Sequence, residues 1–102
     1  MVLEVARISI AEGDEEPFEL AMAEAKAVLA ASPGFLGAEL HRGIERPSEY
    51  WLLVRWETLE SHTVEFRQSD RFVRWRQLIG PYFAAPPETV HAELKEVIQP
   101  KH

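Results

Sequence analysis

One stretch near the middle of the chain constrains the fold most, because it runs an apolar strand directly into a helix. Residues 50–57 have the sequence YWLLVRWE, whose aromatic and branched side chains suit a largely buried strand. Thr58 then offers a hydroxyl to the free backbone N–H groups of a following helix. His62 lies about one turn into that helix and shares a helical face with Phe66. We expect its imidazole to point inward, as a candidate pocket residue near a strand end.

Strand and helix patterns alternate along the rest of the chain. Alternating apolar residues predict strands over residues 2–11, 35–42 and 88–98, beside the central strand over residues 50–57. Helical spacing predicts a helix that begins at residues 14–17 and ends at residue 31, one over residues 59–67, and a segment over residues 71–79 capped by Ser69. This order predicts an α+β, ferredoxin-like βαββαβ fold, an antiparallel sheet with both helices on one face. Residues 1–102 are expected to form a single domain with its core over residues 2–98.

Strand alternation assigns the side chains to two faces of the sheet. The face toward the helices is expected to hold Ala6, Ile8, Ile10, Leu36, Ala38, Leu40, Leu52, Val54, Trp56, Val90, Ala92 and Leu94. The opposite face is expected to hold Val5, Arg7, Glu39, His41, Trp51, Leu53, Arg55, His91, Glu93 and Val97. A small domain would not leave Trp51 and Leu53 exposed, so we expect a homodimer in which two sheets pack together. The charged residues of this face are interpreted as ion pairs, and its two histidines lack a third ligand for zinc.

Composition excludes several classes of function. The chain has 11 basic and 17 acidic residues, and its formal net charge of −6 would repel a nucleic-acid backbone. There is no cysteine, which excludes disulfides, thiolate metal sites and thiol nucleophiles. No apolar run approaches the ~20 residues of a membrane span and no signal peptide is evident, so we expect a cytoplasmic protein without a membrane partner. The chain has no glycine-rich phosphate loop and no nucleophile elbow, so no cofactor and no metal are predicted.

The chain resembles the antibiotic biosynthesis monooxygenase (ABM) domain family of dimeric α+β barrels. The resemblance covers nearly the whole chain and rests on the strand over residues 50–57, on His62, Phe66, Ser69 and Phe72, on Gly80 and Pro81, and on Val90 and His91. It implies a dimer of facing sheets, with a cavity in each protomer between its sheet and its helices. Some members of this family oxidise quinols or polyketide phenols with oxygen and without metal or flavin. Others degrade haem.

The haem-degrading members resemble one another at three places: an Asn in the first strand, a Trp in the third and a His ligand in the second helix. Only the Trp is matched here, by Trp56, whereas Ala6 and Phe66 hold the other two places. We therefore expect any bound haem to lack a defined His ligand, and we do not predict haem degradation.

One candidate site follows from the residues and the resemblance. His62 is predicted to accept a proton or a hydrogen bond from a phenolic oxygen, and its alternative role is structural. The predicted walls of an aromatic cavity are Trp56, Phe66, Phe72, Trp75, Tyr82 and Phe83, which could equally form the core. The predicted function is cofactor-independent monooxygenation of a small aromatic or quinol-type substrate. The alternative is a structural barrel or a small-molecule-binding barrel without turnover.

Overall fold

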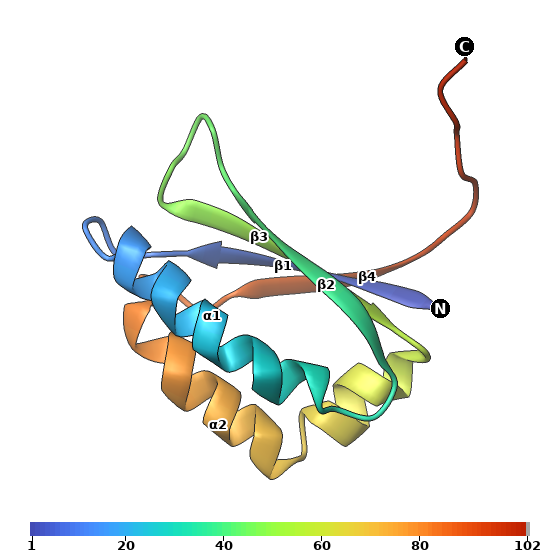
Figure 1. The fold of residues 1–102 in the computed structure, drawn as a ribbon, viewed down its shortest axis with the longest axis horizontal. Helices are drawn as coiled ribbons and strands as arrows, with labels where there is room; N and C mark the ends of the chain where they lie inside the picture. The colour runs from blue at the N-terminus through green and yellow to red at the C-terminus, as the bar shows by residue number, and fades with distance from the viewer. Residues whose placement is uncertain (102) are drawn as a thin grey trace.

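A computed structural model of the protein describes residues 1–101 and shows a four-stranded antiparallel sheet with the helices on one face (Figure 1). The strands are β1 (Val2–Ser9), β2 (Phe35–Arg42), β3 (Glu49–Trp56) and β4 (Glu88–Glu93), in the order β2-β3-β1-β4. The helical segments are α1 (Glu15–Ala30), η1 (Ser61–Phe66), α2 (Asp70–Ile79) and η2 (Gly80–Tyr82). The predicted ferredoxin-like βαββαβ fold is confirmed.

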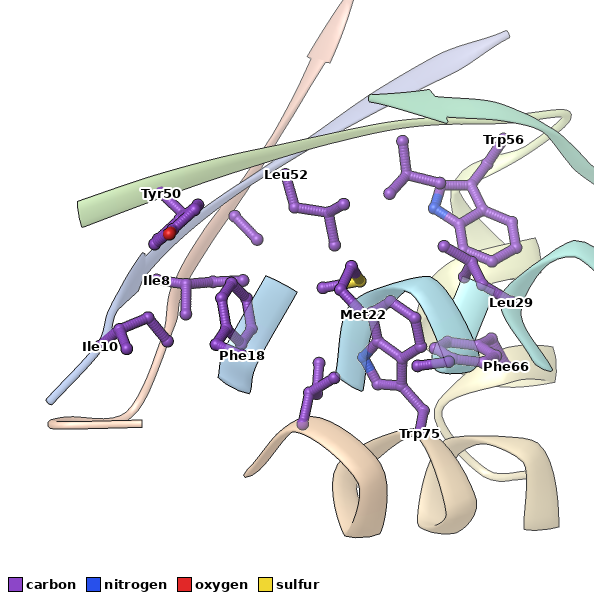
Figure 2. Packing of buried hydrophobic residues seen from close by; sticks show 14 residues of the cluster. Ile8, Ile10, Phe18, Met22, Leu29, Tyr50, Leu52, Trp56, Phe66 and Trp75 are labelled. Atoms are coloured by element: carbon purple, nitrogen blue, oxygen red, sulfur yellow. The ribbon is translucent and has the colours of Figure 1, made fainter. Parts of the chain in front are cut away.

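The core lies between the sheet and the helices. α1 buries Phe18, Met22, Ala25 and Leu29, which recur at helical spacing, while β1 and β3 bury alternate residues. Figure 2 shows Trp56 descending from β3 toward Phe66 of η1 and Trp75 of α2. The inward residues predicted for β1 and β3 are therefore confirmed.

The prediction is wrong for Leu36, which is 51% exposed. The pairing register of β2 with β3 shifts between Phe35 and Gly37, so one residue is left without a partner. Phe35 takes the inward place instead, and its ring meets that of Trp56 edge to face at 5.9 Å.

β4 has its faces opposite to the prediction. His91 pairs with Glu4 on the helix side of the sheet, whereas Val90 pairs with Val5 on the outer side. A change of one residue in register moves every side chain of a strand to the other face. The prediction placed the apolar residues of β4 on the inner face. His91 faces inward instead because its hydrogen-bond partner, His62, lies there, whereas the side chain of Val90 forms no hydrogen bond.

β4 also ends at Glu93, before the predicted end at residue 98. Glu93 pairs with Val2, the first residue of β1, so no neighbouring strand continues past this point. The following segment extends away from the sheet in Figure 1, and Leu94 and Val97 lie outside any strand.

Gly34 connects α1 to β2 and packs against the segment that leads to the candidate site. Its φ is +79°, and a Cβ at this position would overlap the hydroxyl of Ser61. We expect Gly34→Ala to lower the free energy of unfolding by about 2–5 kcal/mol, through left-handed backbone strain and overpacking. Denaturant unfolding measures this loss.

Gly13→Ala is the matched control, because Gly13 also has a positive φ of +94° but faces open space. It should lose only the conformational part, about 1–2 kcal/mol. Equal losses in the two variants would contradict the contact with Ser61.

Candidate functional site

His62 lies in η1, a π-helical turn that follows β3 closely. Thr58 Oγ1 accepts a hydrogen bond from the backbone N–H of Ser61 at 3.1 Å, which confirms its predicted capping role. The backbone N–H of Arg67 donates to the carbonyl of His62, five residues earlier, at 3.1 Å. The predicted ordinary α-helix over residues 59–67 is therefore wrong in its winding, and such wide turns are frequent at functional sites.

α2 begins where predicted. Ser69 is its N-cap, and the hydroxyl of Ser69 accepts a hydrogen bond from the backbone N–H of Phe72 at 3.3 Å.

The imidazole of His62 points inward, as predicted, and is 3% exposed. Its Nδ1 lies 2.8 Å from Nε2 of His91, and its Nε2 lies 3.4 Å from Oε1 of Glu4. Trp56 Nε1–H donates to the same carboxylate oxygen at 2.9 Å. The indole stacks on the imidazole, with ring centres 5.5 Å apart and planes at 17°. We call these residues, Glu4, Trp56, His62 and His91, the polar cluster.

Sequence reasoning missed two members of the polar cluster. Glu4 was not singled out and His91 was assigned to the outer face, although the two residues are paired across β1 and β4. A signal for Glu4 was present, because it has the same strand parity as the buried Ala6 and Ile8. A charged residue in the buried phase of a strand indicates a partner inside.

Burial shifts the pKa values of the cluster. Loss of water lowers the pKa of His62 to about 4, with further contributions from the positive charge of Arg67 and from His91. Burial, followed by Arg67, also lowers the pKa of His91. Burial raises the pKa of Glu4, and the hydrogen bond from Trp56 and the charge of Arg67 oppose this rise. Both imidazoles are therefore neutral at neutral pH.

A cavity of about 350 Å³ lies beside the polar cluster, bounded by η1, α2 and the inner face of β1. Glu4 and His62 belong to its wall, and so do Arg67 and Arg76. The rest of the wall is mainly apolar and comprises Ala6, Ile8, Phe66, Phe72, Trp75, Ile79, Phe83, Pro86, Pro87 and Thr89. Apolar walls with a few converging polar groups are typical of small-molecule sites.

The cavity brings together four of the predicted wall residues, Phe66, Phe72, Trp75 and Phe83. Trp56 is fully buried behind His62 and does not line the cavity. Tyr82 packs partly buried against the core and is not part of the wall either. Phe83, which directly follows η2, lies in the wall instead.

Arg76 covers part of the aromatic wall. Its guanidinium carbon lies 5.9 Å from the ring centre of Phe72 and 5.6 Å from that of Phe83. These cation–π distances place a positive charge beside the apolar lining. The cavity therefore offers positive charge to a ligand that becomes an anion.

Three further findings concern residues 1–101. No group of three or more His, Asp or Glu side chains in this range could hold a metal ion. None of the helices described is both long and apolar enough to cross a membrane. Each buried side-chain nitrogen or oxygen in the same part of the chain has a hydrogen-bond partner.

The low pKa of His62 predicts a pH dependence of stability. Below pH 6.5, the ordinary pKa of histidine, His62 binds a proton in the unfolded chain. In the folded chain it does not bind this proton until the pH nears about 4. The free energy of unfolding therefore falls as the pH drops through this window, and His62 should account for about 2 kcal/mol of the loss between about pH 7 and pH 4.5. His62→Gln should remove this part, as measured by urea unfolding at both pH values.

His41→Gln is the control for this experiment, because it removes an exposed imidazole from the outer face. The opposite pKa shift of Glu4 remains in every variant, so the comparison isolates the imidazole. A pH dependence unchanged by His62→Gln would contradict a neutral buried His62.

The chain has clear relatives. A sequence model described as Antibiotic biosynthesis monooxygenase matches residues 1–78. The uncharacterized protein YczJ of Bacillus subtilis is 36% identical over 91 residues, which cover 89% of this chain and 96% of YczJ. The crystal structure of a provisionally assigned antibiotic biosynthesis monooxygenase from Bordetella bronchiseptica is 41% identical, with a TM-score of 0.91 over 93% of this chain and 97% of that one.

The fold is also that of SnoaB, a cofactor-independent oxygenase from Streptomyces nogalater. Its structure superposes with a TM-score of 0.81 at 18% identity and covers 95% of either chain. The family match over residues 1–78 and the two more similar relatives agree with the resemblance found in the sequence. The chain belongs to the antibiotic biosynthesis monooxygenase family.

Proposed function

We propose that this protein is a cofactor-independent monooxygenase that acts on a small aromatic or quinol-type compound. The observation that supports this is the cavity, whose aromatic walls meet a buried carboxyl and imidazole pair, Glu4 and His62. A flat phenolic ring suits such walls, with its hydroxyl group at the polar end. The shared fold of SnoaB, a cofactor-independent oxygenase, is in line with the same chemistry.

The proposed reaction asks little of the protein beyond its own side chains. An electron-rich phenolate can itself reduce oxygen, so the protein has to remove a proton, orient the ring and exclude water. The raised pKa of Glu4 brings this carboxylate closer to the pKa of a phenol, which makes it a stronger base than an exposed one. Arg67 and Arg76 stabilise the negative charge that develops on the ligand.

We expect oxygen consumption with members of a panel of hydroquinones and anthrones, without added flavin and in the presence of EDTA. Thr89→Phe should abolish this uptake, because Thr89 lines the cavity and a phenyl group would occupy the ligand's space. His62→Ala should slow it by about 100-fold, the usual scale of lost proton-transfer assistance. An oxygen electrode measures both effects.

Thr63→Phe is the matched control, since it makes the same change on η1 outside the cavity wall. It should leave oxygen uptake as it is in the wild type. Full uptake in Thr89→Phe would place the reaction outside this cavity, and full uptake in His62→Ala would remove His62 from the mechanism.

A non-catalytic role is the second candidate, and one observation favours it. The indole of Trp56 and the imidazoles of His62 and His91 have hydrogen-bond partners without a ligand, so the polar cluster has a sufficient structural role. The protein would then be a small-molecule-binding or structural barrel. Calorimetric binding of a phenol by the wild type without any oxygen uptake would support this candidate over the first.

We also propose that the chain forms a homodimer through the outer face of the sheet. Leu53, Val5 and Val90 are paired neighbours across β3, β1 and β4, and Val90 is 62% exposed. This apolar row needs cover, which a second sheet packed face to face would provide. Ion pairs flank the row on both sides, Arg7 with Glu88 at 3.3 Å and Arg55 with Glu39 at 3.9 Å.

Leu53→Glu should weaken the proposed dimer at least about tenfold, because it places an unpaired charge in the core of the interface. Sedimentation equilibrium measures the association. Leu20→Glu is the matched control, since it makes the same change at an exposed position of α1. A wild-type protein that sediments as a stable monomer at micromolar concentration would overturn the dimer.

A further inference from the structure

Glu4, His62 and His91 form a chain of side-chain contacts that begins in the cavity and ends outside it. Glu4 and His62 belong to the cavity wall, but His91 does not. His91 is half-buried and lines a separate surface groove together with Val2, Leu59, Ala92, Glu93 and Lys95. The three side chains therefore cross the wall between the cavity and this groove.

The contacts between Glu4, His62 and His91 pair a donor with an acceptor in two different proton arrangements. In the first, a protonated Glu4 donates to Nε2 of His62, whose Nδ1–H donates to Nε2 of His91. In the second, Nε2–H of His91 donates to Nδ1 of His62, whose Nε2–H donates to an ionised Glu4. The second arrangement holds one proton fewer, and both rings have changed from the Nδ1–H to the Nε2–H tautomer.

We propose that His62 and His91 are a proton relay that connects Glu4 in the cavity with solvent in the surface groove. The proposal rests on the proposed function in one respect, because it makes Glu4 the base that meets the phenolic ligand. In the transfer the O–H bond of Glu4 breaks as Nε2–H of His62 forms, and Nδ1–H of His62 breaks as Nε2–H of His91 forms. The proton on Nδ1 of His91 passes to water, so one proton leaves Glu4 and one enters the solvent.

A relay is needed because of where Glu4 lies. Glu4 is only 7% exposed, and a ligand in the cavity would separate it from the remaining water. Its contacts with Trp56 and His62 are both made by Oε1, so once the relay has removed the proton from Oε1, the ionised carboxylate can accept the proton of the ligand on Oε2. The way through His62 to His91 stays open when the cavity is full, because His91 faces the groove on the other side.

The charged groups around the relay disfavour a positively charged imidazole, so a proton is passed on and not held by either ring. Burial lowers the pKa of both imidazoles most, and the charge of Arg67 lowers it further, so neither ring holds a second proton at neutral pH. The charged groups of the groove, Glu93 and Lys95, pair with each other at 3.3 Å. Arg76 on α2 is the remaining charge on the cavity wall.

The first experiment needs no ligand. Histidine nitrogen NMR of the ¹⁵N-labelled protein reports the tautomers of His62 and His91 as the pH is raised. We expect both rings to change from Nδ1–H to Nε2–H together, in the pH range where Glu4 ionises. In Glu4→Gln the amide oxygen takes the place of Oε1 and accepts from the indole N–H of Trp56 and from Nε2–H of His62, so both rings should stay in the Nε2–H form at every pH. Rings that keep one tautomer while Glu4 ionises would overturn the relay.

The second experiment measures the rate of proton release. 4-Nitrophenol serves as a cavity ligand whose phenolate is followed by its absorbance after a pH jump. His91→Ala should slow the ionisation of the bound phenol at least about tenfold, and imidazole added to the solution should restore the rate from the open groove. His41→Ala, which removes a histidine bonded to Glu39 on the outer face, should have no effect.

His91→Gln separates the relay from a structural role. Its amide keeps a hydrogen-bonding group beside His62, so it should preserve stability and still release the proton as slowly as His91→Ala. Wild-type rates in both variants, or a slow rate that imidazole does not restore, would overturn the proposal. Oxygen uptake tests the proposed function separately: normal uptake without coupled tautomers rejects the relay alone, and coupled tautomers without uptake reject the monooxygenase alone.

Discussion

The buried carboxyl group of Glu4 is the constraint on which the candidate site depends. Burying a polar group without a hydrogen bond costs about 2–7 kcal/mol, and burying an ionised carboxylate without a partner costs more. Here the indole of Trp56 and the imidazole of His62 both reach the same oxygen of this carboxyl. One partner comes from β3 and the other from η1, so this oxygen joins the sheet to the π-helical turn. His91 enters the same cluster because β4 pairs with β1 in the register that sets it opposite Glu4.

The sequence predicted the fold where its signals were local and apolar. β1, β3 and α1 bury residues at the spacing of their own element, and the N-cap at Ser69 needs only its neighbours. The inward direction of His62 followed from the same reasoning, because it depends on a helical face that begins one turn after β3. Such features do not depend on how distant segments meet, so a single sequence is enough to predict them.

Features that depend on distant partners could not be predicted in this way. β4 alternates apolar and polar residues, and the apolar set would ordinarily face the core. His91 reverses this choice because it bonds to His62 on the inner side of the sheet. The two histidines are 29 positions apart in the sequence, so the contact has no local signal. Glu4 was not predicted as a site residue because charged residues of strands are usually exposed. Its hydrogen-bond donor, Trp56, is 52 positions away in the sequence. The π-helical winding of η1 likewise has no local sequence signature.

The composition of the polar cluster bears on whether it is only structural. A neutral buried imidazole needs one donor and one acceptor, and a backbone carbonyl or a hydroxyl next to Nδ1 would have completed the needs of His62. The chain instead places a second imidazole there, half-buried and open to a separate groove. This choice adds an ionisable group that the hydrogen bonding of His62 alone does not require. What the second imidazole does add is coupling, because the tautomer of each ring is tied to the protonation of Glu4. The protonation state of the cavity wall is thereby linked to the solvent on the other side of the sheet edge.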